Sequence, residues 1–494
     1  MSVEAAPPME LGPAVGAVPI DVGHVAIVGS GLAGLAAVIR IRQEQPDQSV
    51  TIIEKASQES NTQIAGMRIR AGTEGQRNSP EDEILELLAA RNGGETTASM
   101  KEFSLLASDS IAHWETKGVF SRDDLGHWFG PQWGESNKAG GGRGKAVLKW
   151  FRDQALAEGV EFRQGEVQHI QIENGHVDGL LVSGVEGLRR IVAERYVLAN
   201  GSAGGQLFLS TNKPINWSAQ ELAFGSSLSI VDSTLHMIHP FGNADEKGNP
   251  QLGCFETDAL EAVEVYFGLS TDPSVLDSET TELLRDHRAH GAFPDIARRF
   301  DERGSVVTLK YSDGAIKRAR VSHHYGHLAV ETTDGLSVRG TSNLYAVGDA
   351  SGLGYWTNHH TRFPGFALLK CLVDAELLLD RIRAPQGVVD EVSSEKRVTS
   401  QAPFPVVLRD RHALLALRGI NSKNLTAWLA ASDPRAKGII GDNWLKELHN
   451  MDQVVPLTLR GLSMAIAFAH LQVGLGGVAE PFPIDRDMAL SYSA

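Results

Sequence analysis

Three glycines follow a short apolar run near the start of the chain, and an acidic residue closes the next apolar run. The first run is Val25–Val28, the glycines are Gly29, Gly31 and Gly34, and the acid is Glu54. A strand that turns through Gly-x-Gly-x-x-Gly into a helix presents N–H groups and the positive end of the helix dipole to a pyrophosphate. An acid at this distance accepts hydrogen bonds from a ribose hydroxyl. The spacing predicts a dinucleotide site, and a structural glycine turn is the alternative.

Three later segments carry a second set of motifs. Ser60–Gly66 is a short polar loop, Arg195–Gly201 is a strand that runs into a glycine-rich turn, and Thr341–Ala350 is a short strand closed by Gly348 and Asp349. Together they resemble the FAD domain of the flavoprotein superfamily of fumarate reductase, succinate dehydrogenase and L-aspartate oxidase, to which 3-ketosteroid dehydrogenases are related. The resemblance implies FAD as the cofactor, with its ribityl chain at the strand–Gly–Asp turn.

The loop at Ser60–Gly66 bears on how the flavin is held. Members of the superfamily with covalently attached flavin have His where this chain has Asn61. Asn cannot form that bond, so the resemblance implies non-covalent FAD. Glu59 and Ser60 replace the Gly pair that usually opens the loop. The adenine is expected beside Val167. The residues expected to contact the cofactor are Gly29, Ser30, Gly31, Leu32, Ala33, Gly34, Glu54, Lys55, Asn61, Thr62, Ala65, Gly66, Val167, Ala199, Asn200, Gly201, Gly348, Asp349, Gly365, Ala367 and Leu368.

Three segments could hold a substrate against the flavin. His239 lies in a stretch similar to the family's Gln-Phe-His-Pro, with Met237 in place of Gln. His324 takes the place of the family's carboxylate-binding His, and Tyr325 follows it. Arg362 resembles the family's carboxylate-binding arginine, whose planar fork suits that anion. Structural hydrogen bonds for the two histidines, and a rim salt bridge for the arginine, are the alternatives.

The proton donor is expected in the middle of the chain. Thr281–Arg288 preserves the start of the family's Thr-Glu-x-x-Arg-Gly-Glu-Gly segment and loses its end, which makes Arg285 the candidate acid and base. The same residues also fit an ordinary charged helix. The mechanism predicted is hydride transfer between flavin N5 and a small carboxylate-bearing substrate, by C–C dehydrogenation, its reverse, or amine oxidation.

Two other functions stay open. Phe363-Pro364-Gly365 is similar to the Tyr-Pro-Gly stretch of ketosteroid dehydrogenases, so a neutral ketone is one alternative substrate, with Tyr325 and Tyr355 as candidate residues. A non-catalytic FAD protein is the other. A zinc site on His236, His239 and the histidines near 324 would lack Cys ligands and helical spacing, so no metal is predicted. No second Gly-x-Gly-x-x-Gly turn supports direct use of NAD(P)H.

Composition limits the partners. The chain has 494 residues and a net charge of −15 with no long basic run, which argues against nucleic acid and anionic membranes. Cys254 and Cys371 are the only cysteines, which excludes a cysteine-ligated cluster or a c-type haem and fits a reducing compartment. The late apolar run Gly461–Ala469 is too short to span a bilayer. We expect a cytoplasmic protein that acts on a small molecule; the electron acceptor is open, and a homo-oligomer is compatible with the sequence.

The fold class expected is α/β: a Rossmann-like FAD-binding domain of the glutathione-reductase type, an inserted α+β cap domain and a mainly helical C-terminal region. The domains expected are a flexible lead-in over residues 1–21, the FAD-binding domain over 22–214 and 320–385, the cap over 215–319, and the C-terminal region over 386–494. A hairpin is expected where Asn174-Gly175 joins Gln168–Ile172 to Val177–Val182.

Overall fold

A computed structural model describes the chain between residues 19 and 383, with internal gaps. The described residues are 19–55, 60–65, 67–69, 79–91, 94–122, 128–129, 143–185, 187–202, 219–226, 228, 230–231, 236–248, 250–254, 259, 261–285, 296, 299–300, 306–326, 329–351, 356 and 365–383. The predicted lead-in and C-terminal region therefore lie almost wholly outside them.

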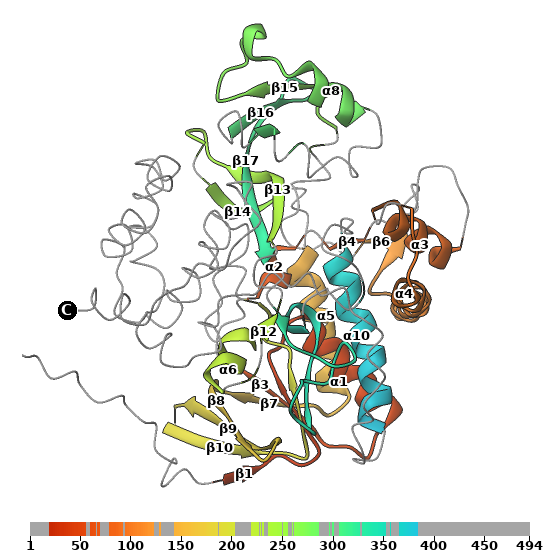
Figure 1. The fold of residues 1–494 in the computed structure, drawn as a ribbon, viewed down its shortest axis with the longest axis vertical. Coiled ribbons are helices and arrows are strands. Elements are labelled where there is room, and N and C mark those ends of the chain that lie inside the picture. The colour runs from red at the N-terminus through yellow and green to blue at the C-terminus, as the bar shows by residue number, and fades with distance from the viewer. Residues whose placement is uncertain are drawn as a thin grey trace, which may run out of the picture.

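A five-stranded parallel sheet is the centre of the structure (Figure 1). Its strands, in spatial order, are β19 (Leu344–Ala346), β11 (Arg195–Leu198), β2 (Val25–Val28), β3 (Val50–Glu54) and β7 (Glu161–Gln164). Every residue of β2 is buried, as expected for a central strand covered on both faces. The parallel sheet of the predicted α/β fold is thus confirmed.

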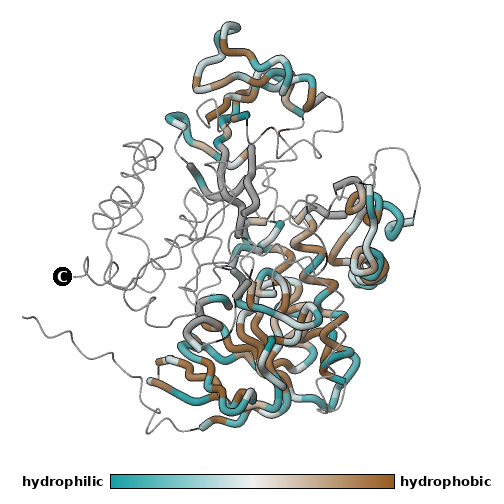
Figure 2. Tube along the Cα trace, in the orientation of Figure 1, coloured by the Kyte–Doolittle hydropathy of each residue, from teal (hydrophilic) through white to brown (hydrophobic). Residues whose placement is uncertain are grey.

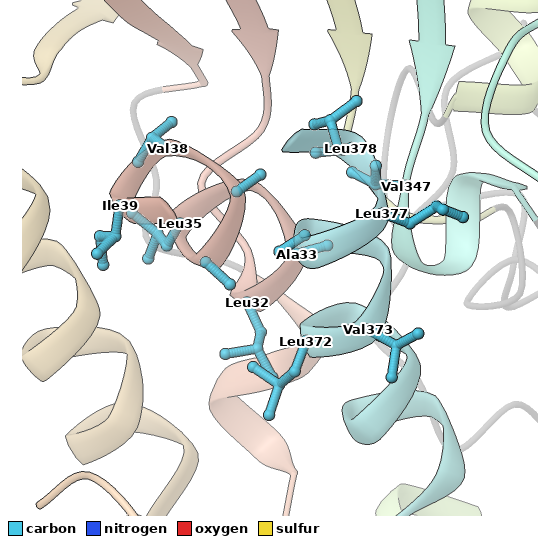
Figure 3. Packing of buried hydrophobic residues seen from close by; sticks show 14 of the residues in the cluster. Leu32, Ala33, Leu35, Val38, Ile39, Val347, Leu372, Val373, Leu377 and Leu378 are labelled. Carbon is cyan, nitrogen blue, oxygen red and sulfur yellow. The ribbon is translucent and has the colours of Figure 1, made fainter. Parts of the chain in front are cut away.

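Helices pack over one face of this sheet and on one another. α1 (Leu32–Glu44) contacts β2 and β3, and it also contacts α5 (Arg143–Ala157) and α10 (Phe366–Arg383). α4 (Ala98–Thr116) packs on α10, and α3 (Pro80–Arg91) packs on α4. Figure 3 shows α1 and α10 side by side, with Leu32 at the start of α1 near Leu372 of α10. Their apolar faces form one core with the sheet, and Figure 2 shows apolar residues gathered there.

A mixed four-stranded sheet covers the other face; its first strand pairs in parallel with the second, and the other pairs are antiparallel. Its order is β1 (Pro19–Asp21), β10 (Gly187–Val192), β9 (His176–Gly184) and β8 (Glu166–Glu173), and α6 (Ala219–Gly225) packs beside β8. The predicted hairpin is confirmed, because β8 and β9 pair across a turn in which Asn174 and Gly175 both have positive φ.

A separate antiparallel sheet lies beyond the parallel one (Figure 1). Its order is β14 (Pro250–Cys254), β13 (His236–Ala244), β17 (Ile316–Gly326), β16 (Val306–Lys310) and β15 (Glu264–Phe267). It has its own core around Phe241, Val265 and Phe300. α8 (Ser278–Arg285) packs against β15, and η2 (Pro273–Val275) precedes it.

Short elements complete the described part. They are α2 (Asn61–Ile64), η3 (Gly348–Ser351), the pair β12 (Ile230–Val231) and β18 (Ala329–Val330), and the small sheet of β4 (Arg68–Ile69), β6 (Trp128–Phe129) and β5 (Ser121–Arg122). No helix in this part of the chain combines the length and the apolar character needed to cross a membrane.

Candidate functional site

In the glycine turn after β2, contacts within the protein require glycine at two of the three positions, Gly29 and Gly34. Gly29 has a φ of +103°, and its N–H donates to Ile53 O at 2.9 Å. A Cβ on Gly29 would lie 2.7 Å from Ala199 O. A Cβ on Gly34 would overlap the carbonyl oxygen of Gly29. Backbone conformation and packing therefore account for Gly29 and Gly34 without any ligand.

Gly31 differs from its two neighbours. It is the N-cap of α1 with a φ of −72°, which any residue adopts. The nearest atom to a Cβ on Gly31 would be Thr62 Oγ1, at 3.7 Å. Nothing in the described protein needs glycine at this position, whereas close approach of a pyrophosphate to the helix N-terminus would need it. The turn therefore fits the predicted dinucleotide.

The short helix α2 closes one side of this turn. Leu32 N–H donates to Thr62 Oγ1 at 3.3 Å, so the polar loop predicted for FAD meets the glycine turn. Gly144, near the start of α5, makes this approach feasible, since a Cβ there would overlap the carbonyl oxygen of Thr62. Gly144 was not among the residues predicted for the site. Its signal in the sequence is a glycine directly before the helix that the pattern predicts over Lys145–Gly159.

The predicted ribose acid Glu54 has an unexpected partner. Arg152 of α5 donates from both terminal nitrogens to the two carboxylate oxygens, at 2.7 and 2.6 Å. Burial tends to raise the pKa of Glu54, but hydrogen bonds from Arg152 and Ser30 outweigh it and hold that pKa below its ordinary value. The guanidinium also lies over the Phe162 ring, 4.2 Å from its centroid. Arg152 thus fixes the orientation of Glu54.

Other predicted residues collect on the same side. Lys55, directly after β3, forms an ion pair with Glu166, and Val167 is buried in β8. Because β3 and β7 are paired, Glu54 lies opposite Gln164, two residues before Glu166. The structure therefore brings the residues predicted for the ribose and the adenine to one edge of the parallel sheet.

The strand–Gly–Asp turn is on the opposite side of β2. Gly348 has a φ of +64°, and a Cβ there would lie 2.7 Å from Ala33 Cβ, so this turn packs on the first turn of α1. Ala199 N–H donates to Val28 O, which ties the end of β11 to the glycine turn. The buried Gln220 of α6 donates to Asp349 O at 3.3 Å. Gln220 was not among the residues predicted for the site.

The predicted substrate residues are placed only by their backbones. In the pairing of β13 with β17, His239 lies opposite Ser322, and Met237 opposite Tyr325. The segments of His239 and His324 are therefore adjacent. Arg285 ends α8, which packs on β15 at the far edge from β14, with β16 between β15 and β17. Arg362, Tyr355 and Gly66 lie outside the described residues, while Gly365, Ala367 and Leu368 lie at the start of α10.

A prediction follows for the Glu54–Arg152 pair. Arg152→Met should lower the free energy of unfolding by about 1–2 kcal/mol at pH 7, because Glu54, whose side chain is 19% exposed, loses its cationic partner. Urea unfolding measures this. The pKa of Glu54 is lower in the folded chain, so its stabilisation is present above the unfolded pKa and is lost as the pH falls through the folded value. The difference in unfolding free energy between the wild type and Arg152→Met should therefore shrink as the pH falls.

The matched control is Lys149→Met on the same helix. Lys149 and Asp153 form an ion pair whose side chains are 55% and 54% exposed, so this change should cost no more than about 0.5 kcal/mol. Equal losses in the two variants, or an Arg152 effect that does not depend on pH, would contradict the role assigned to Arg152.

Comparison with known proteins agrees with the geometry of the turns. Residues 24–238 match the family model described as FAD binding domain. The L-aspartate oxidase of Xylella fastidiosa is 28% identical over 228 residues, which make up 43% of this chain and 43% of that protein. The match therefore spans less than half the length of the curated relative.

Two solved structures are similar over most of the chain. A quinol–fumarate reductase with menaquinol molecules has a TM-score of 0.62 at 18% identity, covering 92% of this chain and 91% of that one. The quinol fumarate reductase of E. coli has a TM-score of 0.58 at 17% identity, covering 92% and 89%. At these identities the similarity shows a shared fold.

Proposed function

We propose that the chain is an FAD-dependent oxidoreductase of the flavoprotein superfamily of fumarate reductase and L-aspartate oxidase, acting on a small carboxylate-bearing substrate. The match of residues 24–238 to the FAD binding domain and the similarity to an L-aspartate oxidase support this proposal. The observation that carries the proposal is the Gly29–Gly34 turn. The space beside Gly31 is not filled by the described protein, and Thr62 of α2 accepts a hydrogen bond from the next residue, Leu32. The bound flavin would supply a two-electron acceptor or donor for the hydride.

The residues of this chain would bind and orient both molecules. The N-terminus of α1 would hold the pyrophosphate, Glu54 the ribose, and the Gly348–Asp349 turn the ribityl chain. Asn61 leaves the flavin without a covalent link. His239, His324 and Arg362 would hold the substrate carboxylate, and Arg285 would move the proton on the neighbouring carbon. Fixed cationic and N–H groups would also stabilise enolate-like charge in the transition state.

Anaerobic absorbance of the purified protein tests this function. The oxidised flavin band should be present, and one class among dicarboxylates, amino acids and 3-ketosteroids should bleach it. Bleaching by a dicarboxylate or an amino acid would support the proposal. Bleaching by a 3-ketosteroid alone would favour a neutral ketone, and a colourless protein would contradict the assignment.

Arg362→Ala should raise KM for that substrate at least about 30-fold, since it removes a charged partner of the carboxylate. FAD should be retained, because the turns that would hold it do not include this residue. Steady-state kinetics and the flavin absorbance measure the two effects. Arg339→Ala, which removes an exposed partner of Glu331, is the control and should leave both unchanged. Full turnover by Arg362→Ala would remove it from the site.

A further inference from the structure

Two oppositely charged side chains are buried one turn apart on α10. Lys370 and Asp374 form an ion pair in which the side chains are 1% and 0% exposed. Removing two charges from water is costly, and apolar residues of similar size are often equally stabilising. Packing of α10 on α1 therefore does not explain why this pair is present.

The partners of the pair are in the turn after β19. Lys370 Nζ donates to Gly348 O at 2.9 Å, to Ser351 Oγ at 2.6 Å and to Asp374, which uses its three donors. Asp374 Oδ2 accepts from Gly348 N–H at 2.7 Å, and Oδ1 accepts from Trp356 Nε1 at 3.3 Å. The pair therefore holds both backbone polar groups of Gly348.

The next two residues of α10 lie beside both turns. Cys371 is partly buried, and its Sγ would lie 3.3 Å from a Cβ on Gly348. Leu372 lies near Leu32 in the first turn of α1 (Figure 3). Residues 370–374 of α10 thus contact the glycine turn and the strand–Gly–Asp turn together. These are the two turns assigned to FAD.

We propose that Lys370 and Asp374 are positioning residues for FAD, which fix the Gly348–Asp349 turn in the conformation that receives the ribityl chain. This proposal rests on the cofactor of the proposed function. An apolar pair could pack as well but could not accept from Gly348 N–H and donate to Gly348 O. The charges are neutralised by each other, so the hydrogen bonds are directed without a net charge beside the flavin.

Two neutral double variants separate orientation from packing. Lys370→Met with Asp374→Asn keeps an acceptor for Gly348 N–H, whereas Lys370→Met with Asp374→Leu removes it at nearly the same volume. The dissociation constant of FAD, measured by fluorescence titration of the apoprotein, should be about tenfold higher in the Leu variant than in the Asn variant. Urea unfolding of each apoprotein reports how much of the effect is loss of fold.

The single variant Lys370→Met should bind FAD more weakly than the Asn double variant, because it leaves the Asp374 carboxylate buried without its cation. Equal FAD dissociation constants in the two double variants would overturn the proposal. These experiments measure FAD binding alone. A wild-type chain that binds FAD but oxidises no substrate would contradict the proposed activity, while the FAD dissociation constants would still decide the role of Lys370 and Asp374.

Discussion

Replacing Gly31 with alanine is expected to abolish retention of FAD while leaving the apoprotein as stable as the wild type. The added methyl group would make only an ordinary contact with Thr62, 3.7 Å away, and the φ of −72° suits alanine. It would occupy the space through which the pyrophosphate approaches the N–H groups of α1. Loss of two hydrogen bonds to a charged group corresponds to roughly 3–6 kcal/mol, or at least about 100-fold in affinity.

Titration of the apoprotein with FAD and urea unfolding of the same sample measure the two quantities. Gly34→Ala is the matched control, because its Cβ would overlap the carbonyl oxygen of Gly29 and should destabilise the apoprotein itself. A Gly31→Ala protein that binds FAD as tightly as the wild type would show that the open side of the turn does not receive the pyrophosphate.

The contrast between these glycines shows what local sequence could predict. The turn, the strands on either side of it and the hairpin at Asn174-Gly175 follow from short-range patterns, since a glycine at positive φ or a buried apolar run constrains the chain nearby. Local patterns also predict helices over Lys145–Gly159 and Gly365–Ile382, and the structure has α5 and α10 there. These features needed no knowledge of distant contacts.

The partners of the site residues depend on contacts across the fold. Arg152 is 98 residues from Glu54, and a charged residue in a predicted helix has no feature that identifies its partner. Lys370 and Asp374 have the spacing of an ordinary surface pair on a helix, and only packing of α10 on the sheet buries them. The substrate segments show the intermediate case, because pairing of β13 with β17 places them together although the sequence suggested no pairing.

Gly144→Ala is the second change with a large expected effect. It should lower both the stability of the apoprotein and its affinity for FAD, whereas Gly31→Ala should lower only the affinity. A methyl group there would overlap the carbonyl oxygen of Thr62 and lie 2.8 Å from that of Gln63. Both atoms are backbone, so no side-chain rotation relieves the contact, and either α5 or α2 must shift. Gly144→Ala should therefore lower the unfolding free energy of the apoprotein by about 1–3 kcal/mol.

The same change should weaken FAD binding, since Thr62 would move away from the N-terminus of α1. Lys145→Ala, at an exposed position next in the helix, is the control and should change neither stability nor affinity. If Gly144→Ala destabilised the apoprotein but bound FAD normally, α2 would be a structural support without a part in the cofactor site. If Gly144→Ala lowered both the stability of the apoprotein and its affinity for FAD, while Gly31→Ala lowered only the affinity, the glycine turn, α2 and α5 would form one binding unit. In that unit Gly31 would face the ligand and Gly144 would be packed against the protein.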